Sequence, residues 1–230
     1  MRRIIKYIVN IKWVKKLLIS CFRIDIWRKW RIRKYLKNAD EPKLQIGCGS
    51  NPLNGWLNTD ISLKCRYGVY LDAGKTFPMS NASFNYVFSE HLFEHLTYPQ
   101  AMNMLKESYR ILKPGGVIRI ATPDLHFLMG LYQEPEKPIN KQYIEYSAKR
   151  GGIPPTPVFM INRFHTAWGH KIIYDNETLK ALLEQVGFKD VCNCEVGQSI
   201  HPALRGVEGH TNSLPDEFNR LETMVLEARK

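Results

Sequence analysis

The hydrophobic pattern of the chain changes character near residue 40. Between residues 4 and 22, apolar side chains recur at three- and four-residue steps, which predicts an amphipathic helix. From residue 43 onward, short apolar runs separated by turns replace this pattern, as expected for buried strands. Pro42 is a plausible stop for a preceding helix. We therefore predict a basic helical extension over residues 1–40 and a separate domain over residues 41–230.

Strands and helices alternate in this second region. Strand candidates occupy residues 43–47, 57–61, 69–71, 84–89, 117–121, 189–196 and 223–228. Helices are expected over residues 98–112 and 176–186, and a turn at the KPGG segment of residues 113–116. The proline- and glycine-rich residues 130–172 are expected to be irregular. The alternation predicts an α/β fold, a Rossmann-like three-layer sandwich around a mostly parallel sheet.

The charge of the chain is concentrated at its N-terminal end. Lys and Arg exceed Asp and Glu by 33 − 22 = 11, and residues 1–40 hold 13 basic residues against two acidic ones. The remaining 190 residues therefore carry 20 charges of each sign. Three interpretations of the extension stay open: binding to an anionic membrane surface, packing on the following domain, and binding to a nucleic-acid backbone. We favour the membrane surface and disfavour nucleic acid, because no nucleic-acid-binding motif accompanies the charge.

No secretory signal is recognised in the sequence, and its cysteines are typical of a cytoplasmic protein. Lysines interrupt the N-terminal apolar run, so no stretch of 18 uncharged apolar residues occurs, and no A-x-A cleavage signal follows it. The five cysteines are an odd number without a zinc-like CxxC pair, which indicates reduced thiols. We expect a cytoplasmic protein, at the inner face of the membrane if the extension binds lipid, and we expect no metal site.

Polar residues follow the strands in an ordered series. In an open parallel sheet, ligands bind at the carboxyl ends of the strands. The turn Gly47-Cys48-Gly49 follows the first strand, Asp60 lies in the second, and Asp72-Ala73, Ser89-Glu90-His91 and Pro123-Asp124 follow the next three. Each of these motifs alone is commonly a turn or a cap. Together they place one glycine turn and four carboxylates at a single edge of the predicted sheet.

Three segments resemble the class I S-adenosylmethionine-dependent methyltransferases. They are LQIGCGSNPLNGWLNTD, YLDAGKTFPMSNASFNYVFSEHLFEHL and ESYRILKPGGVIRIATPDL. The resemblance covers residues 43–125, with a looser match through residues 169–188 and the C-terminal strand. It is closest to the branch in which E-H-L-x-E-H-L follows the fourth strand and K-P-G-G follows later. It implies seven strands with the last antiparallel, and S-adenosylmethionine as cofactor with S-adenosylhomocysteine as product.

Position by position, the resemblance also implies a cofactor site. Gly47 and Gly49 would approach the methionine part of the cofactor, and Asp60 would bind its ribose hydroxyls. Asp72 and the Ala73 backbone would contact adenine, while Ser89 would supply backbone contacts beside the amino acid moiety and the sulfonium.

Two features depart from the family pattern. Gln45 stands where the family usually has an acid, and only about nine residues separate the first two strands, fewer than a crossover usually needs. The short spacing also disfavours a nicotinamide-dependent enzyme, in which a full helix follows the glycines.

Residues beyond the cofactor site suggest the acceptor chemistry. His91, Glu90 and Asp124 are the catalytic candidates, because a hydroxyl acceptor benefits from a general base. An acceptor lid is expected over residues 126–174, with His126, His165, Trp168 and His170 as its binding residues. These residues suggest a methyltransferase acting on a small or glycan-type acceptor, through O-methylation of a cell-envelope saccharide. Two alternatives stay open: a methyltransferase for a soluble metabolite or natural product, and a non-catalytic methyltransferase-like binding module.

Overall fold

The computed structural model describes residues 25–62, 68–210 and 214–230. The chain divides into two compact units, residues 1–40 and residues 41–230. In the first unit, residues 25–38 form a helix, whereas the amphipathic helix predicted over residues 4–22 lies outside the described residues. Within the described ranges, no helix combines the length and the apolar character needed to cross a membrane.

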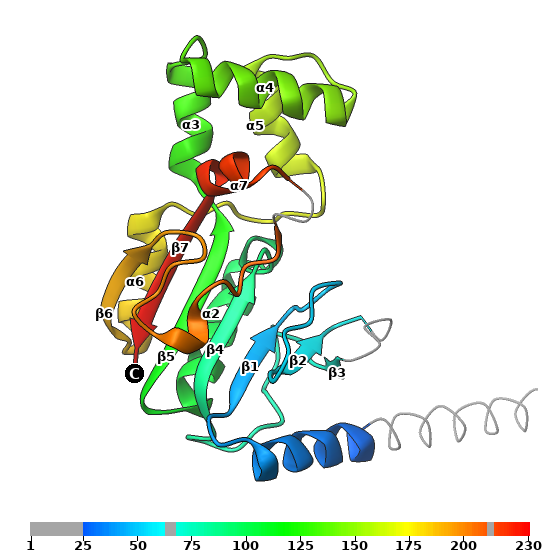
Figure 1. Cartoon of the computed structure of the whole chain (residues 1–230), viewed down its shortest axis with the longest axis vertical. Coiled ribbons are helices and arrows are strands. Elements are labelled where there is room, and N and C mark those ends of the chain that lie inside the picture. The colour runs from blue at the N-terminus through cyan, green and yellow to red at the C-terminus, as the bar shows by residue number, and fades with distance from the viewer. Residues whose placement is uncertain (1–24, 63–67, 211–213) are drawn as a thin grey trace, which may run out of the picture. The chain divides into compact units, whose positions relative to one another are not determined.

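The second unit is built on a seven-stranded sheet with the strand order β3-β2-β1-β4-β5-β7-β6 (Figure 1). The strands are β1 (Lys43–Ile46), β2 (Leu57–Asp60), β3 (Val69–Tyr70), β4 (Phe84–Glu90), β5 (Leu112–Pro123), β6 (Lys189–Cys194) and β7 (Thr223–Arg229). β1 to β5 pair in parallel, and β7 runs antiparallel to both of its neighbours. The predicted mostly parallel sheet with an antiparallel last strand is confirmed.

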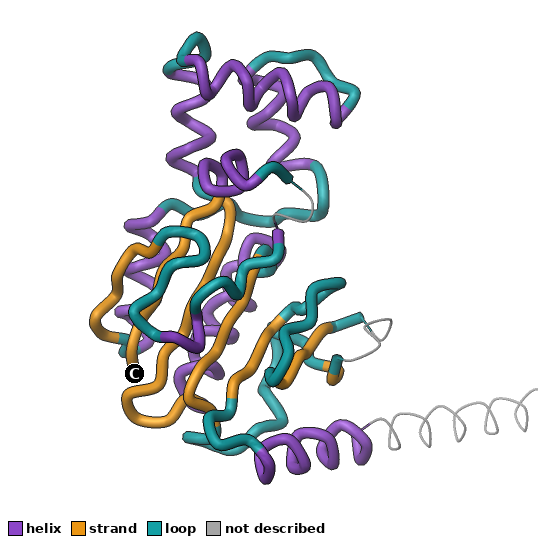
Figure 2. The backbone as a smooth tube through the Cα atoms, viewed as in Figure 1, coloured by secondary structure: helices purple, strands orange, loops and turns teal. Residues whose placement is uncertain are grey.

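Two helices pack together beside the sheet, α2 (Tyr98–Ile111) and α6 (Asn176–Val186) (Figures 1 and 2). α2 begins with a capping box between Thr97 and Gln100, in which each residue satisfies a free backbone N–H group of the other. α6 begins at the carboxylate of Asp175, which accepts the N–H of Thr178, and ends at Gly187 in the left-handed conformation. Both helices agree with the predicted ranges to within one residue.

One region of the sheet is covered in an unusual way. Residues 47–56 join β1 to β2 without a helix, so no crossover helix shields the apolar side chains next to these strands. Trp56, Phe88 and Val117 instead form a cluster with Leu204 and Val207, which lie between β6 and β7. The rings of Trp56 and Phe88 meet edge to face at 6.2 Å. The connection of residues 195–210, which contains the short helix η2 (Pro202–Leu204), thus replaces the missing crossover helix as a cover.

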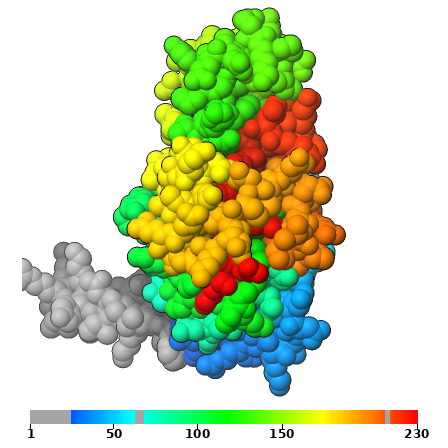
Figure 3. All heavy atoms as spheres, turned by 90° about the vertical axis from the view of Figure 1, so that its left-hand side faces the viewer, coloured from blue at the N-terminus to red at the C-terminus, as the bar shows by residue number. Residues whose placement is uncertain are grey.

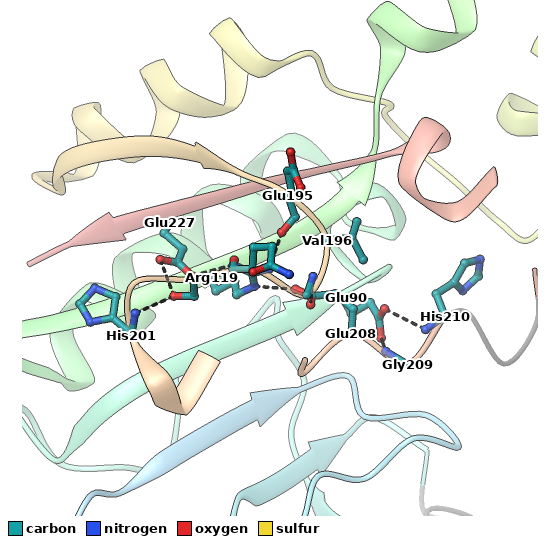
Figure 4. A network of polar contacts seen from close by, with 12 residues as sticks. Glu90, Arg119, Glu195, Val196, His201, Glu208, Gly209, His210 and Glu227 are labelled. Atoms are coloured by element: carbon teal, nitrogen blue, oxygen red, sulfur yellow. Dashed lines mark hydrogen bonds and ion pairs between the residues drawn. The ribbon is translucent and has the colours of Figure 1, made fainter. Parts of the chain in front are cut away.

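A buried arginine attaches this 195–210 segment to the sheet (Figure 4). Arg119 of β5 is fully buried and donates to a carboxylate oxygen of Glu208 at 2.5 Å and of Glu227, on β7, at 2.6 Å. Its remaining N–H groups donate to the carbonyls of Gln198 (2.9 Å) and Glu195 (3.2 Å). Burial lowers the pKa of Arg119, but the two carboxylates outweigh burial and raise the pKa above its ordinary value. The guanidinium therefore stays charged.

A helical cap lies beyond the carboxyl edge of β5 and consists of α3 (Leu125–Gln133), α4 (Pro138–Gly151) and α5 (Pro157–Thr166), with α7 (Asp216–Glu222) next to it (Figures 1 and 3). The prediction that residues 130–172 are irregular is wrong. Pro138 and Pro157 are the first residues of α4 and α5, and Gly152, with φ +62°, ends α4. The first position of a helix needs no N–H group, so proline is favourable there. Glycine adopts a positive φ easily and therefore ends helices.

Smaller differences concern two segments. The KPGG residues, predicted as a turn, form the start of β5, where Gly115 has φ +77° and the pairing with β4 shifts register between Phe84 and Tyr86. Helix α7 has no counterpart in the sequence prediction. Directly after β4, a single turn of 3-10 helix, η1 (Phe93–His95), precedes α2.

The Arg119 cluster generates a stability prediction. Arg119→Met leaves two buried carboxylates without their cation, and we expect it to lower the free energy of unfolding by roughly 3–5 kcal/mol. Urea denaturation measures this change. As a matched control, Lys180→Met removes one partner of an exposed ion pair with Glu184 and should change stability by less than about 0.5 kcal/mol. A loss below about 1 kcal/mol for Arg119→Met would contradict the role assigned to the cluster.

Candidate active site

The turn after β1 presents bare backbone at the carboxyl edge of the sheet. Gly47 and Gly49 have φ of +72° and +49°, a conformation that L side chains rarely adopt. A Cβ atom on Gly47 would lie 3.0 Å from the Leu92 side chain, so a larger residue there would force Leu92 to move. The N–H groups of Gly47 and Cys48 both donate to the Thr59 carbonyl, at 2.8 and 2.9 Å, and tie the turn to β2.

Asp60, the last residue of β2, lies directly beside this turn. Its two carboxylate oxygens accept the N–H groups of Gly49 (2.9 Å) and Ser62 (2.6 Å). Each oxygen keeps a further lone pair, so the carboxylate can still accept hydrogen bonds from two neighbouring hydroxyls. This geometry fits a ribose diol held next to the glycine turn.

The other residues expected to contact the cofactor follow β3 and end β4. Asp72 accepts the N–H of Gly74 at 3.0 Å and pairs with the exposed Lys75 at 3.3 Å, and Ala73 is buried next to it. The hydroxyl of Ser89 is buried and has no hydrogen-bond partner in the described part of the chain. An unpaired buried hydroxyl is costly, so a polar group of a bound ligand would stabilise it. The residues present therefore fit the cofactor.

Gln45 replaces the acid of the family pattern and has a structural role. Its amide nitrogen donates to the carbonyl of Asn51 at 3.0 Å, and its amide oxygen accepts the N–H of Leu53 at 3.1 Å. A carboxylate could not donate the first of these bonds. Gln45 thus holds the short β1–β2 connection in place.

A cavity of about 410 Å³ adjoins the carboxyl ends of β4 and β5 and extends to α4 and α5 of the cap. Its volume falls in the range of small-molecule sites, about 300–1,000 Å³. The aromatic wall consists of Tyr143, Tyr146, Phe164 and Trp168. The charged side chains are Glu94, Glu222, Arg150 and Arg163. Four histidines complete the lining: His91, His95, His170 and His210.

His91 is fixed at the floor of this cavity. Its backbone has φ +45°, a rare conformation for a residue with a side chain and one that is typical of functional sites. Its Nδ1 lies 3.2 Å from Glu94 Oε1, its Nε2 lies 3.3 Å from Thr223 Oγ1, and its ring stacks on His210 at 4.0 Å. Burial lowers the pKa of His91, but the hydrogen bond and charge of Glu94 outweigh it, and the pKa lies above its ordinary value.

Glu94 is fully buried and accepts a hydrogen bond from the hydroxyl of Thr122 at 3.0 Å. Burial raises the pKa of this carboxyl most strongly, but the hydrogen bond and charge of His91, a backbone hydrogen bond and the charge of His95 together outweigh burial and lower the pKa below its ordinary value. Glu94 is therefore a buried carboxylate. It fixes the orientation of the His91 ring.

The two other catalytic candidates are engaged in backbone contacts. The oxygens of Glu90 accept the N–H groups of Gly209 and His210, each at 3.0 Å, which ties residues 209–210 to β4 (Figure 4). Asp124 is the N-cap of α3 and accepts the N–H of His126 at 2.8 Å; burial raises its pKa. Asp124 does not line the cavity.

The predicted acceptor-binding residues divide into two groups. Trp168 and His170 line the cavity, whereas His126 and His165 are exposed and do not belong to its lining. Sequence analysis missed the contribution of α4, where Tyr143, Tyr146 and Arg150 share one face at the helical spacing i, i+3 and i+7. That spacing is visible in the sequence once the segment is recognised as a helix.

The geometry of Asp60 generates a binding prediction. Asp60→Asn keeps the shape but removes the charge that strengthens hydrogen bonds to hydroxyls, worth about 1.5–3 kcal/mol. We expect S-adenosylmethionine and S-adenosylhomocysteine to bind about 10- to 100-fold more weakly, as measured by titration calorimetry. Asp175→Asn changes a carboxylate that also accepts a backbone N–H, but at the start of α6, and should leave the affinity unchanged. Equal affinities for both variants would refute the role of Asp60.

Comparisons with known proteins found a family model and solved structures that this chain resembles. Residues 10–120 match a family model described as a methyltransferase domain. Among solved structures, the chain is similar to an S-adenosylmethionine-dependent methyltransferase from Archaeoglobus fulgidus, with 19% identity, a TM-score of 0.48, and coverage of 88% of this chain and 92% of that one. A second, from Mesorhizobium loti, shows 15% identity, a TM-score of 0.47, and coverage of 90% and 100%.

The family match and the site agree on one enzyme class. The strand order, the glycine turn after β1, the carboxylate at the end of β2 and the unpaired Ser89 hydroxyl belong to one ligand-binding edge. We conclude that residues 10–120 match a methyltransferase domain and that the chain resembles the class I S-adenosylmethionine-dependent methyltransferases, whose cofactor its site residues fit.

Proposed function

We propose that the enzyme methylates a hydroxyl group of a small, polar, ring-shaped acceptor, a saccharide. The observation that carries this proposal is the His91–Glu94 pair, which follows β4 directly and lines the 410 Å³ cavity. A hydroxyl is a weak nucleophile and benefits from a base, whereas an amine needs only to arrive unprotonated. A histidine oriented by a buried carboxylate supplies such a base.

The walls of the cavity support a sugar-like acceptor. Tyr146 and Trp168 offer aromatic faces against which the C–H groups of a ring can pack. Arg150 and Arg163 supply N–H donors, and Glu222 supplies an acceptor. Few apolar aliphatic side chains line the cavity within the described chain, where Met160 and Leu214 are the main examples. This mixture favours a compact molecule with several hydroxyls over a long hydrocarbon.

The proposed mechanism assigns a role to each residue near the reacting hydroxyl. The Nδ1–H group of His91 donates to Glu94, and an acceptor hydroxyl that replaces Thr223 Oγ1 beside Nε2 would give its proton to that nitrogen. When bound, the cofactor supplies an electrophilic methyl group on a sulfonium. The aromatic wall excludes water and aligns the acceptor oxygen, and alignment of this kind accounts for much of the rate in a displacement reaction.

A kinetic measurement tests this role of His91. With labelled S-adenosylmethionine and a panel of monosaccharides, nucleotide sugars and amines, we expect methyl transfer to a sugar hydroxyl. His91→Asn should lower kcat by about 10²- to 10⁴-fold without weakening cofactor binding. His201→Asn, whose ring lies beside Tyr86, is the matched control and should keep full activity. Transfer to amines alone, or full activity of His91→Asn, would overturn the proposal.

We also propose that the N-terminal extension holds the enzyme at an anionic membrane surface. Within the helix of residues 25–38, six basic residues accompany one acidic residue. Ile26, Trp27 and Trp30 are about half exposed, at 53%, 47% and 55%. Arg31 lies over the Trp27 ring at 4.9 Å and Lys34 over the Trp30 ring at 5.1 Å. Paired tryptophans and cations suit the headgroup region of a bilayer, where an envelope saccharide intermediate would be anchored.

Vesicle co-sedimentation of the full chain tests the membrane proposal. We expect binding to vesicles containing phosphatidylglycerol that weakens as salt is raised, because surface charges are screened. The double variant Trp27→Ser, Trp30→Ser should reduce the bound fraction several-fold. Tyr132→Ser, at an equally exposed aromatic residue on α3, should bind like the unmodified chain. Failure of the unmodified chain to sediment with anionic vesicles would exclude the attachment.

A further inference from the structure

We propose that Glu94, His95 and His170 form a binding site for a divalent transition-metal ion of the Zn²⁺ type, in the wall of the acceptor cavity. The sequence gives no hint of such a site, because no spacing of its histidines fits a standard zinc motif. The three side chains come together only in the fold. Glu94 and His95 belong to η1, and His170 follows α5.

The donor atoms of this triad are close enough to share one ion. One ligand atom from each residue lies within 4.8 Å of the others, and Nε2 of His170 is 4.0 Å from Oε1 of Glu94. A tetrahedral ion with bonds of about 2.1 Å separates its ligand atoms by about 3.4 Å. Rotations about side-chain bonds that move the donor atoms by about 1 Å close this difference. Two imidazoles and one carboxylate are also a known donor set for catalytic zinc.

His170 is held in the orientation that a metal ligand needs. Its Nδ1 donates to the backbone carbonyl of Phe164 at 2.6 Å, which directs Nε2 toward Glu94. Metal-binding histidines almost always have their other ring nitrogen fixed in this way. Trp168 and Gly169, immediately before it, both adopt the left-handed conformation, with φ of +57° and +82°. A positive φ strains the backbone of Trp168, because this residue carries a Cβ atom. Strain of this kind is typical of functional sites.

The charge of the cluster also favours a cation. Glu94 has no exposed surface, and its ion-pair partners in the described part of the chain are the imidazoles of His91 and His170. A buried carboxylate is costly unless a neighbouring positive charge compensates it, and an imidazole supplies that charge only when it is protonated. An ion bound between Glu94, His95 and His170 would compensate this charge, and His91 would keep its hydrogen bond to the same carboxylate.

A bound ion would keep positions for other ligands. Three protein ligands leave at least one coordination position of Zn²⁺ open, and all three of these residues line the cavity. An acceptor hydroxyl at that position would be oriented, and its proton would become more acidic. This role rests on the proposed function, whereas metal binding itself does not.

A second group of potential ligands must be separated from this one. Cys192, Cys194 and Glu227 also lie close together, on β6 and β7. Burial raises the pKa of the Cys194 thiol to about 12, but a zinc ion displaces the proton of a thiol that it binds, so this group has to be removed before the test. Cys192→Ser removes the group, and we use it as the background for every variant.

The test is metal titration of the full chain without an acceptor. We expect Zn²⁺ to bind with a stoichiometry of one ion per chain by calorimetry, and Co²⁺ to give visible absorption bands without thiolate-to-cobalt charge transfer. His170→Ala should weaken Zn²⁺ binding by at least about 10- to 100-fold. Mutation of a residue that only hydrogen-bonds to a metal ligand already lowers metal affinity by this amount. His201→Ala, outside the cluster, should bind as before.

A second variant guards against loss of folding. Glu94→Gln keeps the volume of the side chain, and thermal unfolding establishes whether each variant is folded. Folded variants that bind Zn²⁺ as tightly as the Cys192→Ser background would overturn the proposal, as would the absence of binding to the background itself. Because no acceptor is present, a failed acceptor screen would count against the proposed function and leave this result unaffected.

Discussion

The ion cluster around Arg119 determines where the 195–210 segment lies on the sheet. Its guanidinium links β5 to Glu227 of β7 and to Glu208 of the 195–210 segment, with no exposed surface. Buried ion pairs add little net stability, but a missing partner leaves a buried charge, so the cluster strongly disfavours any other placement of the segment. The N–H groups of Gly209 and His210 then meet Glu90, and His210 stacks on His91. One wall of the acceptor cavity therefore depends on an arginine that does not line it.

The cofactor edge and the acceptor cavity differ in how they are built. Each part of the cofactor edge is a turn or a carboxylate that directly follows or ends its own strand. Each part can therefore be recognised from a short stretch of sequence. The cavity instead combines η1, α4, α5 and α7, which lie far apart in the chain. Its histidines approach one another across these elements, with the rings of His95 and His170 4.8 Å apart. Changes in the cap can thus alter the lining of the cavity while the cofactor edge stays constant.

This difference explains what could be predicted from the sequence. The strands and the residues of the cofactor edge follow from local patterns, such as Gly47-Cys48-Gly49 and the aspartate at the end of β2. Sequence analysis proposed Glu90 as a catalytic candidate. Its hydrogen bonds could not be predicted, because they involve backbone amides 119 and 120 residues away. The cap looked irregular because Pro138, Pro157 and Gly152 mark helix ends as readily as loops. The pairing of Glu94 with His170 has no local signal at all.

The cover that the 195–210 segment provides has a consequence for biosynthesis. Trp56 and Phe88 are made early, yet the residues that shield them, Leu204 and Val207, are made near the end of the chain. In most parallel sheets a crossover helix shields such side chains as soon as the next strand is complete. In this protein the cover of Trp56 and Phe88 is complete only when almost the whole domain has been translated. Completion of the fold is thereby coupled to completion of synthesis, and during that interval a chaperone has a defined surface to bind.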